Sequence, residues 1–220
     1  MSLLVLKPRP LARDSGSLRD DRLFIVACDD SYAPKQYFNF FQLPRVQVYV
    51  VPTPINNNRC HAIDVLERLE SIDFSGDDER WMLLDTDHYD KGTHLQEFTR
   101  IIKEATEKGI AVALSKPCFE LWLLLHYVDE GLVETLIDAS AVEFKLREIL
   151  GEYNKRNLKV DHYPLESVVS AFQRAKALDA ITTGGMIPLS NTSRVYKLWE
   201  VIIKNALPSQ LPVEFQNLLF

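Results

Sequence analysis

The feature that most constrains the fold of this chain is a repeated alternation between short apolar runs and helical segments. Four apolar runs rich in strand-forming residues occupy residues 23–28, 46–52, 81–85 and 110–115, and each leads into a segment of helical character. This alternation is typical of α/β domains, in which helices cover both faces of a mainly parallel sheet. The chain is therefore predicted to be an α/β protein.

The β pattern ends near Val128, and a helical pattern takes its place. Three amphipathic segments follow, at residues 141–153, 165–179 and 193–207, before a tail interrupted by prolines. At the other end, the first residues mix proline, arginine, serine and glycine without periodicity. These patterns predict a flexible arm at 1–21, an α/β core at 22–127, and a helical extension with its tail at 128–220.

The charge balance argues against simple coating of nucleic acid. The 220 residues include 25 basic and 31 acidic side chains, for a net charge of −6, whereas proteins that neutralise many phosphates are usually basic. A metal-dependent phosphodiester enzyme escapes this objection, because its acidic centre binds cations and the cations meet the phosphate.

Other features of the composition favour a cytoplasmic protein without membrane contact. No apolar stretch approaches the ~18 residues of a membrane span. The three cysteines, Cys28, Cys60 and Cys118, are odd in number and scattered, which favours reduced thiols. The N-terminus has no basic segment before its short apolar run and no small-residue cleavage site, so we expect no secretory signal.

Acidic residues follow two of the predicted strands, at the edge where open α/β sheets bind ligands. Asp29 and Asp30 follow the first apolar run, and Asp85 and Asp87 end or follow the third. Residues two apart in an extended chain share a face, so Asp85 and Asp87 can converge on one cation. Their oxygens are the ligands that Mg²⁺ and Mn²⁺ prefer. An ordinary polar turn or helix cap is the alternative.

The segment "PCFELWLLLHY", residues 117–127, places one glutamate, Glu120, in a predicted helix that is apolar nearly all round. Such a helix is buried, and a buried glutamate is unusual unless it is paired or bound to metal. Glu120 is thus a candidate for the metal site, and the alternative is that it caps its own helix. We interpret His126 as a hydrogen-bonded core residue, and Phe119 and Trp122 as core.

Some basic side chains lie where they could contact phosphate. Lys116 directly precedes the buried helix, at the mouth of the expected site, and is the strongest of them. Lys197 fits a solvated helix face better than a phosphate site. Arg59, in the loop after the second run, is a weaker candidate. His88, directly after Asp87, is interpreted as a residue that supports the metal ligands or as an ordinary loop residue. The chain has no glycine-rich phosphate loop, so we do not expect it to bind ATP itself.

Residues 116–127, "KPCFELWLLLHY", resemble the signature segment of the RloB-like family, also called the AbiLii type. In that family the segment usually reads Asn-Pro-Cys-Phe-Glu-Leu-Trp-Leu-Leu-Leu-His-Phe. Two more segments agree in order and spacing. "LLDTDHYD" at 83–90 resembles the family's strand ending in Asp-Arg-Asp, and "NTSRVYKLWEVI" at 191–202 resembles its late helix. The resemblance spans about residues 23–202.

The resemblance implies a Toprim-like or Rossmann-like α/β sheet, because the family is similar to Toprim-domain nucleases. A Toprim site holds Mg²⁺ with a glutamate after the first strand and the Asp-x-Asp after the third, which correspond here to Asp29, Asp85 and Asp87. The family is found beside restriction-modification and abortive-infection genes, often paired with an AAA/ABC-type ATPase. It therefore implies cleavage of nucleic acid in bacterial anti-phage defence.

The first motif departs from the family pattern. That pattern usually reads Cys-Glu-Gly-x-x-Thr-Glu-Pro-x-Tyr-Phe, whereas this chain has "CDDSYAPKQYF" at 28–38. Asp29 takes the place of the glutamate and is one methylene shorter, and Asp30 replaces the glycine. A general base displaced by ~1 Å can lower the rate about a hundredfold. Thr86 also replaces the usual arginine within Asp-x-Asp.

We therefore predict a nuclease that depends on Mg²⁺ or Mn²⁺. Asp29, Asp85 and Asp87 would hold the metal, Glu120 would assist, and Lys116 would position phosphate. The alternative is a catalytically degenerate Toprim-like partner that docks to an ATPase without cleaving nucleic acid. A phosphate-binding sensor without hydrolysis also fits the sheet. The sequence leaves open whether the substrate is DNA or RNA and whether the chain forms a homo-oligomer.

Overall fold

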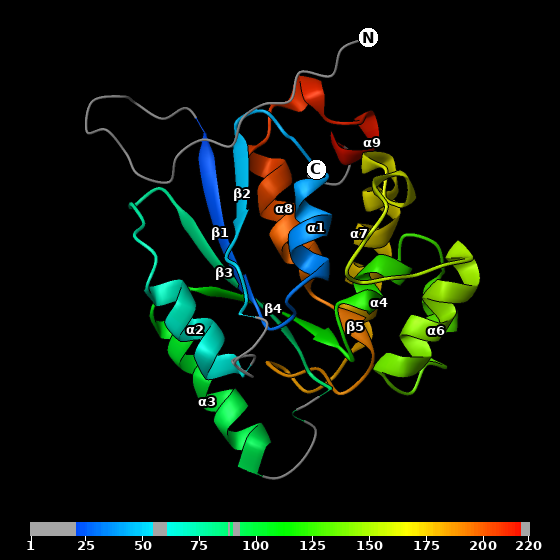
Figure 1. Ribbon diagram of the computed structural model, residues 1–220, viewed down its shortest axis with the longest axis horizontal. Helices are drawn as coiled ribbons and strands as arrows, with labels where there is room; N and C mark the ends of the chain where they lie inside the picture. Colours follow the sequence, from blue (N-terminus) through cyan, green and yellow to red (C-terminus); the bar gives the residue numbers. More distant parts are fainter. Residues whose placement is uncertain (1–20, 55–60, 88, 90–92, 217–220) are drawn as a thin grey trace.

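The computed structural model describes residues 21–54, 61–87, 89 and 93–216. Its five-stranded sheet has the order β2-β1-β3-β4-β5 (Figure 1). The strands are β1 (Arg22–Cys28), β2 (Val46–Val50), β3 (Glu79–Asp85), β4 (Ala111–Lys116) and β5 (Thr192–Ser193). The first four run parallel, and β5 is antiparallel to β4. The predicted α/β sheet is confirmed, with the four apolar runs as its parallel strands.

Helices cover both faces of this sheet. They are α1 (Ala33–Asn39), α2 (Ala62–Glu70), α3 (Thr93–Glu107), α4 (Glu120–Leu124), α5 (Glu130–Val133), α6 (Ala139–Leu150), α7 (Leu165–Ile181), α8 (Val195–Asn205) and α9 (Val213–Gln216), with short 3-10 helices at Val160–His162 and Pro208–Gln210. In Figure 1, α2 and α3 lie together on one side of the sheet, whereas α1, α7 and α8 lie on the other.

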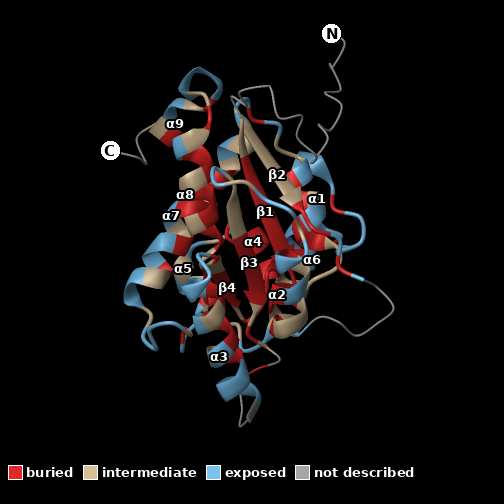
Figure 2. Ribbon diagram, turned by 90° about the vertical axis from the view of Figure 1, so that its left-hand side faces the viewer, coloured by how far each residue is buried: buried red, intermediate tan, exposed pale blue. Residues whose placement is uncertain are grey.

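Alternation along β1 divides its side chains between two hydrophobic cores. Phe24, Val26 and Cys28 belong to the core that includes α1, α4, α7 and α8, whereas Leu23 and Ile25 belong to the core that includes α2 and α3. All five are at most 2% exposed, and Figure 2 shows the central strands as buried. A strand covered on both faces reads as a continuous apolar run, which is the pattern that predicted it.

The core on the α1 side is rich in aromatic rings. Tyr37 of α1 lies at its centre, 0% exposed, and seven rings surround it with centroid distances of 5.1–6.3 Å in edge-to-face geometry. We call Tyr37 and these rings the aromatic cluster: Phe38, Phe41, Phe119, Trp122, His126, Tyr163 and Trp199.

The helical extension packs into this same core. Leu198 of α8 lies in one buried cluster with Phe24 of β1. The extension also supplies β5, where Ser193 pairs with Ser115 of β4. The sequence predicted no strand beyond Val128, because two polar residues give no apolar pattern.

Two helices end before their predicted limits. The buried segment 117–127 holds only the short α4, which tight turns with hydrogen bonds between residues three apart flank on either side. α6 ends at Gly151, whose φ of 74° terminates the helix, rather than continuing to Tyr153. No helix among the described residues is long and apolar enough to span a membrane. Of the predicted arm at 1–21, only Asp21 is described.

Candidate metal centre

The acidic residues singled out in the sequence lie at the switch point of the sheet. The connections from β1 and β3 lead to opposite sides there, because β2 and β4 lie on opposite sides of this strand pair. Ligands of open α/β sheets bind at the carboxyl ends of strands at such a point. Asp29 and Asp30 follow β1, Asp85 is the last residue of β3, and Asp87 comes two residues later; all four are half-buried.

Asp29 links the ends of β1 and β3 through both carboxylate oxygens. Its Oδ1 accepts the N–H of Asp30 at 2.9 Å, and its Oδ2 accepts the N–H of Asp85 at 2.8 Å. Burial raises the pKa of Asp29 to about 7, and the nearby charges of Asp30 and Asp87 add to this, while the N–H of Asp85 opposes it. Asp29 is therefore held against the edge of the sheet, directly beside Asp85.

Asp85 and Glu120 bring further negative charge to the same place. Burial raises the pKa of Asp85 well above its usual value, and the charges of Asp29 and Glu120 raise it further. Glu120 is 3% exposed and accepts a hydrogen bond from the Tyr153 hydroxyl at 2.9 Å. Burial and the charge of Asp30 raise the pKa of Glu120, while the Tyr153 hydroxyl lowers it. We call these five carboxylates the acid cluster: Asp29, Asp30, Asp85, Asp87 and Glu120.

The Asp-x-Asp turn is docked onto the end of β4. The N–H groups of Thr86 and Asp87 both donate to the carbonyl oxygen of Pro117, at 3.1 and 3.2 Å, and the Thr86 N–H also donates to the Ser115 carbonyl at 3.0 Å. The peptide bond between Lys116 and Pro117 is cis. These hydrogen bonds join the Asp-x-Asp segment to the segment 116–127 and so place both in one site.

Asp30 accepts backbone hydrogen bonds just before α1. Its Oδ1 accepts the N–H groups of Tyr32 at 2.5 Å and Ala33 at 2.8 Å, which satisfies backbone donors at the start of α1. Its Oδ2 lies 3.6 Å from Lys155 Nζ. Asp30 is thus engaged by the backbone before α1, one residue beyond the predicted metal ligand.

Lys116 and Lys155 are placed differently with respect to the acid cluster. Lys116 ends β4, and strand alternation directs its side chain to the face opposite that of Ser115 and its register partner Asp85. Its role in positioning phosphate stays a prediction. Lys155 approaches the acid cluster from the extension, and the negative charges of that cluster raise its pKa even though burial opposes the rise.

Tyr153 and Lys155 are site residues that the sequence did not reveal. Both lie just after α6, in a stretch where the helical pattern was expected to continue to residue 153. Gly151 was the available signal, because glycine at φ near 74° is the usual residue that ends a helix. Nothing in the sequence pattern, however, indicated that the chain beyond Gly151 turns toward the ends of β1 and β3.

His126 is a core residue, as interpreted from the sequence. It is 6% exposed, its Nε2 lies 3.0 Å from the Tyr37 hydroxyl, and its Nδ1 lies 2.7 Å from Ser167 Oγ. Burial lowers the pKa of His126 to about 3, and the charge of Arg174 lowers it in the same direction. This histidine is therefore neutral and committed to packing.

The remaining basic candidates lie away from the acid cluster or outside the described residues. Lys197 Nζ lies 3.1 Å from Asp179 Oδ2, within a network that also includes Arg194. It contributes to the packing of α8 on α7. Arg59 and His88 lie outside the described residues.

The acid cluster fits a divalent metal in its chemistry but is not yet arranged around one. It offers only carboxylate oxygens, which Mg²⁺ and Mn²⁺ prefer. Burial and the neighbouring negative charges raise the pKa of Asp29 and Asp85, and a bound dication would offset this repulsion between carboxylates. Within the part of the chain that the structure describes, no group of three or more His, Cys, Asp and Glu side chains has the arrangement of a metal site.

Comparison with known proteins agrees with the resemblance in the sequence. A profile of the RloB-like protein family matches residues 24–202. This range contains β2 to β5 and all but the first two residues of β1, together with all residues of the acid cluster and both Tyr153 and Lys155. Searches among curated proteins and among solved structures found no match.

Proposed function

The chain belongs to the RloB-like family, and from this premise we propose that it is a divalent-metal-dependent nuclease. It would cleave phosphodiester bonds of DNA or RNA in bacterial anti-phage defence, with an AAA/ABC-type ATPase as its partner. The observation that carries the proposal is the hydrogen bond between Asp29 and the N–H of Asp85, residues 56 apart in the sequence. It brings the acid after β1 to the Asp-x-Asp after β3, at the edge where α/β enzymes bind ligands.

Asp29, Asp85 and Asp87 would hold Mg²⁺ or Mn²⁺. A bound ion would supply positive charge to the phosphate and acidify a bound water. Asp29 would also fix the distance between the two strand ends through its backbone hydrogen bonds. Glu120, held by the Tyr153 hydroxyl, would place a further carboxyl group with a raised pKa beside the reacting phosphate.

Cleavage of DNA and RNA by the purified protein tests this function. We expect single-stranded DNA, duplex DNA or tRNA to be cut in Mn²⁺ and left intact in EDTA. Asp85→Asn should lower the cleavage rate roughly 100-fold or more, because it removes a charged ligand from the centre of the cluster. Asp73→Asn, at an exposed loop position, should match the wild type. No cleavage of any substrate, together with wild-type protection by Asp85→Asn in a phage challenge, would contradict the proposal.

A second function is favoured by the way Asp29 is held. Both of its oxygens already accept backbone N–H groups, and it is shorter than the glutamate of related proteins. A chain whose first acid is used to join two strands could be a catalytically degenerate subunit that docks to an ATPase. In that case the acid cluster would be part of the scaffold.

Calorimetric titration with Mn²⁺ separates the two functions. A nuclease should bind Mn²⁺ at a site that Asp87→Ala removes, with the thermal stability of the variant unchanged in the absence of metal. A scaffold should show the same titration for wild type and Asp87→Ala. Co-purification with the ATPase does not distinguish them, since both functions include that partner.

A further inference from the structure

The segment between α6 and α7 crosses from the extension to the carboxyl end of the sheet. We call residues 151–164 the crossing loop. Gln36 of α1 holds it at two points: Gln36 Nε2 donates to the Lys155 carbonyl at 2.7 Å, and Gln36 Oε1 accepts the N–H of Leu158 at 3.0 Å. One side chain of α1 thus fixes the backbone of the loop on both sides of residue 156.

Two aromatic residues strengthen this placement. Tyr153 is buried and donates its hydroxyl proton to Glu120. Further along, the Arg156 guanidinium lies 5.1 Å from the centre of the Tyr32 ring, at the start of α1. The crossing loop is therefore bound to the three elements that surround the acid cluster, namely the turn after β1, helix α1 and helix α4.

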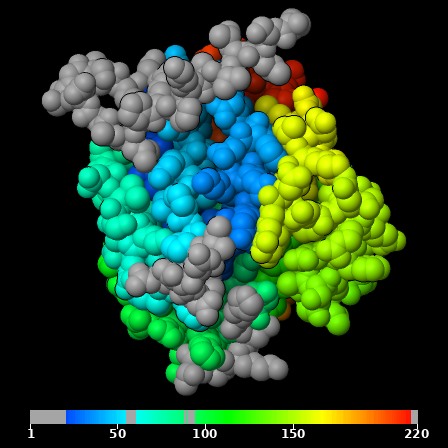
Figure 3. Space-filling model, in the orientation of Figure 1, coloured from blue at the N-terminus to red at the C-terminus, as the bar shows by residue number. Residues whose placement is uncertain are grey.

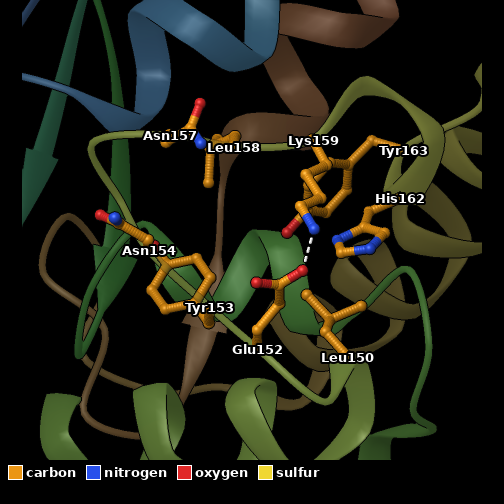
Figure 4. Close-up of a pocket in the computed structure, with 9 residues that line it drawn as sticks. All are labelled: Leu150, Glu152, Tyr153, Asn154, Asn157, Leu158, Lys159, His162 and Tyr163. Carbon is orange, nitrogen blue, oxygen red and sulfur yellow. Dashed lines mark hydrogen bonds and ion pairs between the residues drawn. The ribbon is translucent and has the colours of Figure 1, made fainter.

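The two lysines of the crossing loop have different partners: Lys159 pairs with Glu152 within the loop, whereas Lys155 pairs with Asp30 of the acid cluster. A small hollow of about 80 Å³ lies along the loop. Figure 4 shows the residues that line it, among which Lys159 is directed toward Glu152. These two form an ion pair. Lys159 is therefore engaged within the loop, on a side of it different from that of Lys155, which is directed at Asp30.

Lys155 is the cation that the crossing loop brings to the acid cluster. Its Nζ lies 3.6 Å from Asp30 Oδ2, and its side chain is 45% exposed, so that the ammonium group touches both the cluster and solvent. A phosphodiester approaching five carboxylates meets strong repulsion unless cations stand beside them. In a chain of net charge −6, a lysine at this edge has a large local effect.

We propose that Lys155 binds a backbone phosphate of the nucleic acid beside the acid cluster, so that the extension completes the site. This inference rests on the proposed nuclease function and names the residue that receives its substrate. The Lys155 ammonium can exchange the Asp30 carboxylate for a phosphate oxygen, because it is a mobile point charge on a flexible stem. The contact is with the backbone, so it should not depend on base sequence.

Binding of a fluorescent single-stranded oligonucleotide, followed by anisotropy in Ca²⁺, tests the inference without requiring cleavage. Lys155→Gln should weaken binding about tenfold and reduce the slope of log K against log salt by about 0.7, the change expected for one lost phosphate contact on a single strand. Lys155→Arg should restore most of the affinity. If the oligonucleotide is also cut, the loss for Lys155→Gln should appear mainly in KM.

Lys204→Gln is the matched control. Lys204 of α8 is 53% exposed and lies 3.4 Å from Glu200, much as Lys155 lies near Asp30. It sits at the opposite edge of the sheet, because the N–H of Leu207 donates to the carbonyl of Pro44 just before β2. Its removal should leave binding and the salt slope unchanged.

Equal binding by Lys155→Gln and Lys204→Gln would overturn the inference, and so would an absence of oligonucleotide binding by the wild type. A wild type that binds but never cleaves in Mn²⁺ has a different meaning. It would contradict the nuclease function, while a selective loss in Lys155→Gln would still support phosphate binding at this position.

Discussion

The acid cluster and the aromatic cluster share two stretches of chain and differ in charge and in packing. Residues 28–38 supply Asp29 to the first and Tyr37 to the second, and residues 116–127 supply Glu120 to the first and Trp122 to the second. The aromatic cluster packs its rings against one another in the core of the protein. The acid cluster gathers like charges whose pKa values are raised by burial and by each other.

Both ring nitrogens of His126, the histidine of the aromatic cluster, are hydrogen-bonded within the protein. Ser167 Oγ donates its proton to the Pro164 carbonyl at 2.7 Å, so it must accept the proton of His126 Nδ1. His126 Nε2 then accepts the Tyr37 hydroxyl proton. Each group has one role, and the chain of hydrogen bonds is neutral. The longest sequence motif, residues 116–127, therefore mainly specifies packing, and few of its residues bear on chemistry.

The largest expected effect comes from breaking the aromatic cluster. Trp122 is 0% exposed and central to α4, so Trp122→Ala should lower the free energy of unfolding by about 3–5 kcal/mol through lost contacts and a cavity. Urea denaturation followed by circular dichroism measures this. Phe144→Ala, at a ring 66% exposed on α6, should change stability by less than about 0.5 kcal/mol. Similar losses in both variants would show that the cluster is not the main core.

The acid cluster should respond to pH in the opposite sense from carboxylates that are paired with cations in the folded state. The folded-state pKa of Asp29 is raised to about 7 and that of Asp85 is raised well above its usual value. The folded state therefore binds more protons than the unfolded state between about pH 4 and pH 7, and stability falls as pH rises through this window. Without metal, the wild type should lose roughly 2–4 kcal/mol between pH 5 and pH 8 from this source.

Asp85→Asn sharpens that expectation, because it removes one of the crowded charges. The variant should be more stable than the wild type at pH 8 in EDTA and nearly equal to it at pH 5. Mn²⁺ should stabilise the wild type at pH 8 and have little effect on the variant. Urea midpoints at the two pH values provide the measurement. A variant that is less stable than the wild type at pH 8 would show that Asp85 is favourably paired.

The smallest effect compares one tyrosine from each region. Tyr153→Phe removes the hydroxyl that donates to Glu120 and leaves a buried carboxylate short of a donor, which should lower stability by about 1–2 kcal/mol. Tyr163 of the aromatic cluster is also buried, and its hydroxyl has no hydrogen-bond partner among the described residues. Tyr163→Phe should therefore be neutral or slightly stabilising. The reverse order of these two losses would contradict the assignment of Tyr153 to Glu120.

Sequence reasoning succeeded where one residue pattern decides the structure. The parallel strands follow from continuous apolar runs, and the meeting of Asp29 with Asp85 follows from the rule that parallel strands end at one edge. The buried state of Glu120 follows from the apolar residues on all sides of it. In each case local pattern and tertiary environment agree.

It failed where a position is fixed only by distant contacts. Lys155 reaches Asp30 because Gln36, 119 residues earlier, binds the backbone of the crossing loop. No periodicity encodes such a contact. Strand β5 was not predicted for a related reason, since its two polar residues form a strand only by pairing with β4. The role of Lys116, chosen from its closeness in sequence to Glu120, stays a prediction, because closeness in sequence does not reveal the face to which a strand residue points.

The hydrogen bond between Tyr153 and Glu120 limits how this protein can diversify. Its donor lies in the extension and its acceptor in the sheet-forming half, and the pairs of Lys155 with Asp30 and of Leu158 with Gln36 are divided in the same way. Recombination that joined one half to a foreign counterpart would separate all three pairs at once. The two halves should therefore be inherited together, and substitutions on one side should be accompanied by compensating changes on the other.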